Sequence, residues 1–161
     1  MADDNWIVGI AEYKATQSPN RLTAYGLGSC VGIVLYDQYT KVGGLAHIML
    51  PSSRFYSQVA LPGKFADTAI DALLTEMKNL GCRRERLFSK IVGGANMFSL
   101  ISQSAVPIGL RNVAAVREEL KKREIPILAE QVGGTSGRTV IFDLVSGRVE
   151  IRKLNQSTEW V

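Results

Sequence analysis

The sequence predicts an α+β fold, a single layered sandwich in which two main helices pack on mixed or antiparallel β-sheets. Short runs of apolar and β-branched residues recur along the chain, each bounded by Gly, Pro, Asn or Asp, which is typical of strands. Two further segments carry apolar residues at helical spacing. The expected strands are residues 6–11, 31–36, 42–50, 87–92, 125–132, 139–144 and 148–154.

The first helix is expected over residues 66–80. It follows Pro62 and Gly63, and Gly81 stands where a left-handed C-terminal cap is favoured. Its apolar residues recur every three or four positions, which predicts one buried face: Ala66, Ala69, Ile70, Leu73, Met77 and Leu80.

The second helix is expected to begin after Asn112, whose side chain can cap a helix N-terminus. Residues 121–123 are basic and suit the C-terminal end of the helix dipole, and Pro126 lies just beyond. Its expected buried face consists of Val113, Val116 and Leu120.

Hairpin turns are expected at residues 37–41 and 146–147. The least ordered stretches are expected at residues 52–61 and 155–161. The predicted order is therefore strands, helix, strand, helix and strands.

Length and composition favour one folded domain over residues 1–161. Hydrophobic residues make up 46% of the chain and charged residues 21%, which excludes disordered and fibrous classes. The net charge of +4 comes from 19 basic and 15 acidic residues without a charged block, so nucleic acid is not an expected partner. No apolar run is long enough to span or insert into a membrane, and the acidic start does not resemble a signal peptide. We therefore expect a cytoplasmic protein.

Metal and disulfide chemistry are not expected. The chain has one histidine and two cysteines, Cys30 and Cys82, without the spacing of a zinc site. A disulfide is disfavoured in a reducing compartment. Cys82 is expected to be an unreactive thiol. We expect neither a bound metal nor a cofactor.

Cys30 is the first candidate for chemistry. It follows the glycine-rich residues 26–29 and precedes an expected strand, so its sulfur can lie at a strand end beside backbone N–H groups near Gly28 and Ser29. Such a position suits a nucleophile. The alternative is that Cys30 is a small core residue, because free cysteine is often buried.

His47 is the only histidine, so any cysteine–histidine dyad has to join it to Cys30. It lies in an apolar strand, where an imidazole is out of place unless it is hydrogen-bonded or functional. A hairpin centred between Gln38 and Tyr39 would place Cys30 directly opposite His47. The alternative is a buried histidine with a structural hydrogen bond.

The pair would perform acyl transfer on an amide. A histidine near a thiol lowers the thiol pKa and later protonates the leaving group, so we expect a lowered pKa for Cys30. A third group should orient the imidazole of His47, and the candidates are Thr23, Ser29 or a backbone carbonyl.

Two further glycine-rich segments carry weaker signals. Residues 133–138 predict a turn, because they lack the lysine of a phosphate-binding loop and precede a strand. Residues 93–98 could line a cleft, where Asn96 could hydrogen-bond a substrate amide; an ordinary surface connection is the alternative.

Five segments in the same order resemble the CheD family of chemoreceptor glutamine deamidases: residues 26–30 (GLGSC), 44–51 (GLAHIMLP), 62–69 (PGKFADTA), 93–98 (GGANMF) and 133–138 (GGTSGR). The resemblance implies a cysteine hydrolase that converts glutamines of methyl-accepting chemotaxis receptors to glutamates, on a layered fold similar to the catalytic domains of deamidating toxins. It implies that Cys30 is the nucleophile and His47 the base.

One position departs from the pattern of the family. A threonine six residues before the cysteine often serves as the third catalytic member there, and this chain has Ala24, with Thr23 one residue earlier. The resemblance also implies a partner, the CheC-type phosphatase of the response regulator. The alternative function is a non-catalytic module that docks on receptors or on this phosphatase. A protein substrate needs an open groove, which we expect between residues 52–61 and 93–102.

Overall fold

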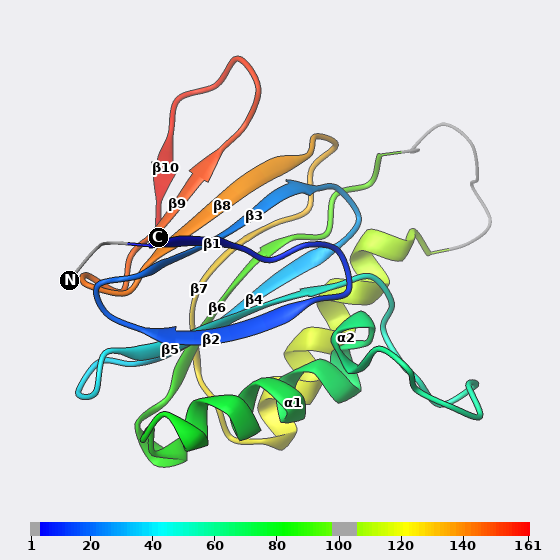
Figure 1. The fold of residues 1–161 in the computed structure, drawn as a ribbon. Coiled ribbons are helices and arrows are strands. Elements are labelled where there is room, and N and C mark those ends of the chain that lie inside the picture. Colours follow the sequence, from blue (N-terminus) through cyan, green and yellow to red (C-terminus); the bar gives the residue numbers. More distant parts are fainter. Residues whose placement is uncertain (1–3, 98–105) are drawn as a thin grey trace.

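The computed structural model describes residues 4–97 and 106–161, which form two five-stranded sheets and two α-helices (Figure 1). We call the sheets outer and central. The outer sheet has the spatial order β1 (Asn5–Ile7), β3 (Arg21–Leu27), β8 (Arg138–Asp143), β9 (Val149–Arg152) and β10 (Glu159–Trp160). The central sheet has the order β2 (Tyr13–Gln17), β5 (Val42–Ile48), β4 (Val31–Asp37), β6 (Phe88–Gly93) and β7 (Ile127–Val132). The helices are α1 (Ala66–Asn79) and α2 (Ile108–Lys122), with short 3₁₀ turns η1 (Pro62–Lys64) and η2 (Arg84–Arg86).

The central sheet lies between the outer sheet and the helices, so the molecule has three layers (Figure 1). Every residue of β4 and β5 is buried, because these strands have a hydrophobic core on each face. One core joins the central sheet to α1 and α2, and the other joins it to β3, β8 and β9. Each sheet contains one parallel pair, β1 with β3 and β6 with β7. The predicted α+β sandwich with mixed sheets is confirmed.

The first helix is confirmed, while the predicted start of the second is wrong. α1 ends at Asn79, and Gly81 follows with a φ of +95°. Leu80, predicted on the buried face, is the C-cap and is exposed, because the helix has already ended there. α2 begins at Ile108, four residues before Asn112, and Pro107 occupies its N-cap position. A proline pre-sets a helical φ at the start of a helix. Asn112 therefore lies inside the helix, where its side chain is fully buried.

The strand predictions missed part of the N-terminal third of the chain. The expected strand over residues 6–11 ends at Ile7, while β2 and β3 occupy residues with no predicted element. β2 lies at a sheet edge and mixes polar with apolar residues, which weakens a pattern-based signal. The tail is also more ordered than expected, because it contains β10 and because Val161 exchanges two backbone hydrogen bonds with Val149. Residues 52–61 contain no helix or strand.

Both predicted hairpin turns exist, but the first has a different register. Asp37 pairs with Val42, which centres the turn between Tyr39 and Thr40 instead of between Gln38 and Tyr39. The buried carboxylate of Asp37 causes this, because it accepts hydrogen bonds from the N–H groups of Tyr39 (3.0 Å) and Thr40 (3.4 Å).

No helix in the described part of the chain has the length and apolar character needed to cross a membrane.

The end of β6 packs tightly against the start of β4 and the first turn of α2. Gly93 has a φ of +115°, and a Cβ there would collide with the carbonyl oxygen of Cys30. Gly94 has a φ of +66°, and a Cβ there would collide with Val113. A Cβ on Gly109 would collide with the carbonyl oxygen of Ala95. These three glycines let β4, β6 and α2 converge at one end of the sandwich.

We expect Gly93→Ala to destabilise the protein more than Gly81→Ala. Both positions have positive φ, which costs an alanine about 1–3 kcal/mol, but nothing lies within 4 Å of a Cβ on Gly81. The additional loss in Gly93→Ala, about 1–3 kcal/mol, measures the overpacking against Cys30. Urea denaturation of both variants tests this expectation, and equal losses would contradict it.

Candidate active site

Cys30 lies in the turn between β3 and β4, at the end of the sandwich where β6 and α2 converge. It is partly exposed and packs against the core between the two sheets. The side chains of Val34 and Tyr36, further along β4, also belong to this core. Cys30 therefore faces the space between the central and outer sheets, with an open side toward solvent.

His47 lies near the end of β5 and faces the same space. It is directly opposite Gly32, so the predicted direct pairing with Cys30 is wrong by two residues. A shift of two keeps the face, because side chains alternate with a period of two. His47 shares its face with Leu45 of the core between the sheets, and Cys30 is its diagonal neighbour across a glycine.

The imidazole of His47 is 1% exposed and is held at one nitrogen only. Its Nδ1 lies 3.2 Å from the carbonyl oxygen of Val8. Its Nε2 is buried and has no hydrogen-bond partner among the described residues. Burial lowers the pKa of His47, against smaller raising effects from the Val8 carbonyl and the charge of Glu12. The histidine is therefore neutral at physiological pH.

A backbone carbonyl, one of the three predicted alternatives, is the group that contacts His47. Thr23 is fully buried, but its hydroxyl donates to Oδ1 of Asn5 at 2.6 Å. Its neighbours Leu22 and Ala24 both face the core between the sheets, so Thr23 faces the other side of the outer sheet. Thr23 therefore does not orient the imidazole in this structure.

The thiol pKa moves in the direction opposite to the prediction. Burial raises the pKa of Cys30, and its own backbone N–H opposes this effect without reversing it. No hydrogen bond joins the Cys30 sulfur to His47 in the described part of the chain. Desolvation disfavours the charged form of both side chains, so it favours a neutral thiol and a neutral imidazole over a thiolate and an imidazolium.

The turn of residues 28–30 has its three carbonyl groups bound. The carbonyl of Gly28 accepts from Ala95 N (2.8 Å), that of Ser29 from Asn112 Nδ2 (2.9 Å) and that of Cys30 from Gly94 N (2.8 Å). Apart from the Cys30 sulfur itself, no described residue accepts a hydrogen bond from the N–H groups of Ser29 and Cys30. Since a trans peptide points its C=O and N–H in opposite directions, the N–H groups of Ser29 and Cys30 point away from these donors.

Asn96 lies beside this turn. Its backbone N–H donates to the carbonyl of Gly134 at 2.8 Å, and the preceding residue, Ala95, holds Gly28. Its side chain is partly exposed. Residues 133 and 134 have positive φ values of +81° and +74°, which confirms the predicted turn there. Of the expected groove, residues 98–102 lie outside the described residues.

Asn112, expected as a helix cap, instead holds two backbone carbonyls inside the fold. Its Nδ2 donates to the carbonyl of Ser29 and also to that of Met49, both at 2.9 Å, while its buried Oδ1 has no partner in the described structure. The sequence contains one indication of this contact. Asn112 lies four positions before Val116, so it is a polar residue on the apolar face of the helix.

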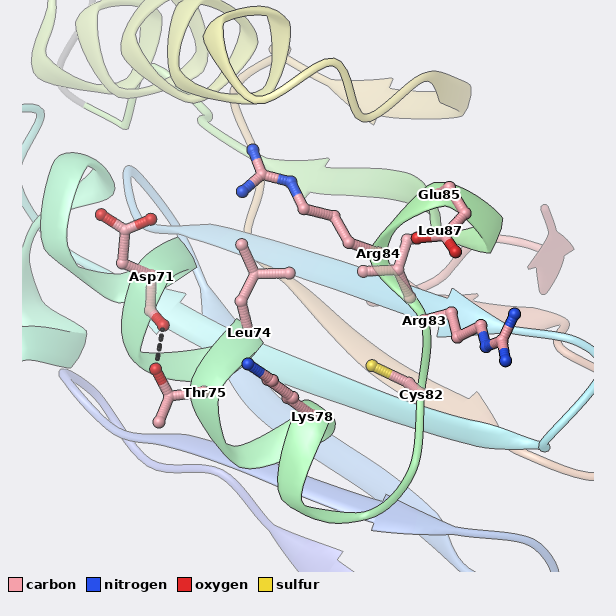
Figure 2. A pocket seen from close by; sticks show the side chains of 9 residues that line it. All are labelled: Asp71, Leu74, Thr75, Lys78, Cys82, Arg83, Arg84, Glu85 and Leu87. Carbon is pink, nitrogen blue, oxygen red and sulfur yellow. Dashed lines mark hydrogen bonds between the residues drawn. The ribbon is translucent and has the colours of Figure 1, made fainter.

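A pocket of about 610 Å³ lies away from this site, between the second half of α1 and the connection to β6 (Figure 2). Its lining includes Cys82, which is largely buried and belongs to the core beneath the helices. Arg83, also in the lining, donates its N–H to Asp37 at the far end of β4 from Cys30. Both cysteines are free thiols, and they pack in different cores, Cys30 between the sheets and Cys82 beneath the helices.

Within residues 4–97 and 106–161, no three histidine, cysteine or carboxylate side chains are grouped so as to hold a metal ion.

Comparisons with known proteins agree with the resemblance found in the motifs. The family model described as CheD chemotactic sensory transduction matches residues 49–153. A Desulforamulus reducens protein named "Probable chemoreceptor glutamine deamidase CheD" is 54% identical over 148 residues, which cover 91% of this chain and 89% of the relative. A Clostridium botulinum protein of the same name is 48% identical over 153 residues, or 94% of each chain. The chain belongs to the CheD family.

Proposed function

We propose that this protein is a glutamine deamidase that converts glutamines of methyl-accepting chemotaxis receptors to glutamates, with Cys30 as nucleophile and His47 as base. The names of the relatives support the reaction and the substrate. The observation that carries the assignment of residues is the buried, unpartnered Nε2 of His47, on the strand face that Cys30 shares.

The contact with Val8 selects the tautomer of His47 that a base requires. A carbonyl oxygen only accepts, so Nδ1 carries the proton that it donates to Val8. Nε2 of the neutral ring is then unprotonated and can take the thiol proton. The carbonyl of Val8 replaces the hydroxyl that the family pattern places at residue 24.

In the proposed reaction, the sulfur of Cys30 attacks the carboxamide carbon of glutamine while His47 removes the thiol proton. The N–H groups of Ser29 and Cys30 stabilise the oxyanion, since their only other acceptor among the described residues is the Cys30 sulfur itself. The C–N bond breaks, the imidazolium protonates the departing ammonia, and a thioester remains. Water, deprotonated by His47, attacks the thioester and releases glutamate and the thiol.

The pKa directions support proton transfer during attack. A neutral thiol needs a base at the moment of attack, and a histidine with a lowered pKa stays available as a base below pH 6.5. We assign to Asn96 a hydrogen bond to the substrate amide, because its side chain is partly exposed and the preceding residue, Ala95, holds the carbonyl of Gly28.

We further propose that the protein works in the cytoplasm, on the cytoplasmic part of the receptors, and that it binds a CheC-type phosphatase. Membership in the CheD family supports this proposal.

Cys30→Ala is expected to lower deamidation of a chemoreceptor cytoplasmic fragment by about 10³-fold or more, because no other group forms the thioester. Ammonia release and mass-spectrometric mapping of glutamine-to-glutamate conversion measure this, with Cys82→Ala as the matched control that keeps wild-type activity. Receptor binding without conversion by the wild type would instead make the protein a docking module.

The pH dependence of Cys30 alkylation is expected to follow one ionisation above that of a free cysteine peptide, because burial raises the thiol pKa. Iodoacetamide labelling, followed peptide by peptide, should show a rate that rises throughout pH 6–9. Buried Cys82 should react more slowly. A rate plateau between about pH 5 and 8 would reveal a thiolate–imidazolium pair and contradict the neutral pair.

The free energy of unfolding is expected to fall as the pH drops from 7 toward 5. The unfolded state binds a proton at His47 near pH 6.5 and the folded state only at a lower pH, so this stabilisation is complete above pH 6.5 and is lost as pH falls through the folded pKa. Since His47 is the only histidine, His47→Gln should flatten the dependence in denaturant titrations. An unchanged slope in His47→Gln would contradict the lowered pKa.

A further inference from the structure

We propose that Asn112 is a positioning residue of the active site, whose side-chain amide holds the turn of the nucleophile and the strand of the base in a fixed relation. This inference rests on the proposed function of Cys30 and His47. The proposal gives α2 a part in the reaction. The side chain of Asn112 makes no hydrogen bond to Cys30 or His47 themselves and acts through the neighbouring backbone.

The two hydrogen bonds of Asn112 reach the chain beside both reacting residues. Ser29 immediately precedes Cys30, and Met49 lies two residues after His47. A primary amide carries two N–H hydrogens, so one Nδ2 satisfies both carbonyls at 2.9 Å. A single side chain therefore bridges the two segments.

Asn112 bridges the two segments at a point where β4 and β5 are no longer paired. The pairing of β4 with β5 ends at Val31 and Ile48, so Ser29 and Met49 lie beyond the paired positions. Asn112 supplies at this end the donors that another strand would otherwise supply. Without it, two carbonyls at the end of the sheet lose their partners.

The position is unfavourable for an asparagine on grounds of stability alone. Asparagine is a weaker helix former than leucine, and the buried Oδ1 has no partner among the described residues. The neighbouring Val113 and Val116 both belong to the core beneath the sheet. An apolar residue would satisfy the packing, so the amide is explained by the two carbonyls it holds.

Close packing of α2 against the segment after β6 brings Asn112 within reach of both carbonyls. Gly109 lies against the carbonyl oxygens of Gly94 and Ala95, with no space for a Cβ. The N–H groups of these same two residues hold the carbonyls of Cys30 and Gly28. A movement of α2 would therefore change the direction of all three carbonyls of the turn, and with them the N–H groups that face the oxyanion.

The test compares Asn112→Leu with Val116→Ala, a core truncation one turn further along the same face of α2. Asn112→Leu should lower kcat for receptor-fragment deamidation about 10²-fold with KM changed less than about 3-fold, because displacement of the reacting groups affects the transition state. Val116→Ala should lower the melting temperature but keep kcat within about 2-fold of wild type. Equal kcat values for the two variants would overturn the proposal.

Asn112→Asp keeps the side-chain volume and decides the case if Asn112→Leu does not fold. A protonated carboxyl can donate to one carbonyl, whereas a carboxylate donates to none. Its kcat relative to wild type should therefore rise as pH falls from 8 to 6, and a ratio independent of pH would overturn the proposal.

Hydrogen exchange separates this inference from the proposed function. The amides of Gly94 and Ala95, which donate to the carbonyls of Cys30 and Gly28, should exchange faster in Asn112→Asp at pH 8 than in Val116→Ala, whatever the reaction. If Cys30→Ala still deamidates while this exchange difference is present, the proposed nucleophile is wrong and the positioning role of Asn112 stands. Equal exchange contradicts the positioning role.

Discussion

The inward orientation of three successive carbonyls, at residues 28–30, is the constraint on which the site depends. Gly94, Ala95 and Asn112 supply the donors, from the end of β6 and from α2. Because each peptide unit is planar, binding its carbonyl also sets the direction of its N–H. The N–H groups beside the Cys30 sulfur are thereby presented away from the protein interior by residues more than 60 positions later in the chain.

This constraint accounts for glycines that are distant in sequence. Gly93, Gly94 and Gly109 lie where a Cβ would collide with backbone or core atoms. Glycine at these positions therefore allows β6 and α2 to approach the turn. Two of them also adopt positive φ. The glycines of the turn therefore explain only part of its conformation. The glycines at the end of β6 and in α2 explain the rest.

His47, the proposed base, is held by a different part of the chain. The segment between β1 and β2 passes from the outer to the central sheet, and on the way its Val8 carbonyl meets Nδ1 of His47. The same segment exchanges backbone hydrogen bonds with His47 through Ala11 and Glu12. A main-chain carbonyl can thus orient the imidazole, which explains how a family member can carry alanine at residue 24. Burial keeps both the imidazole and the thiol neutral, so the site stores no ion pair before the substrate arrives.

The sequence by itself determined the sandwich class, the first helix, both hairpin turns and the two candidate reacting residues, because these follow from local patterns and from the presence of a single histidine. Only the tertiary structure decided the hairpin register, which the buried carboxylate of Asp37 sets, and the partner of His47. It also decided the role of Asn112, which resembles a helix cap in sequence and is a buried bridge in the fold. The physical reason is that every residue carries a carbonyl group, so sequence cannot indicate which carbonyls a fold will bring to a given donor or ring nitrogen.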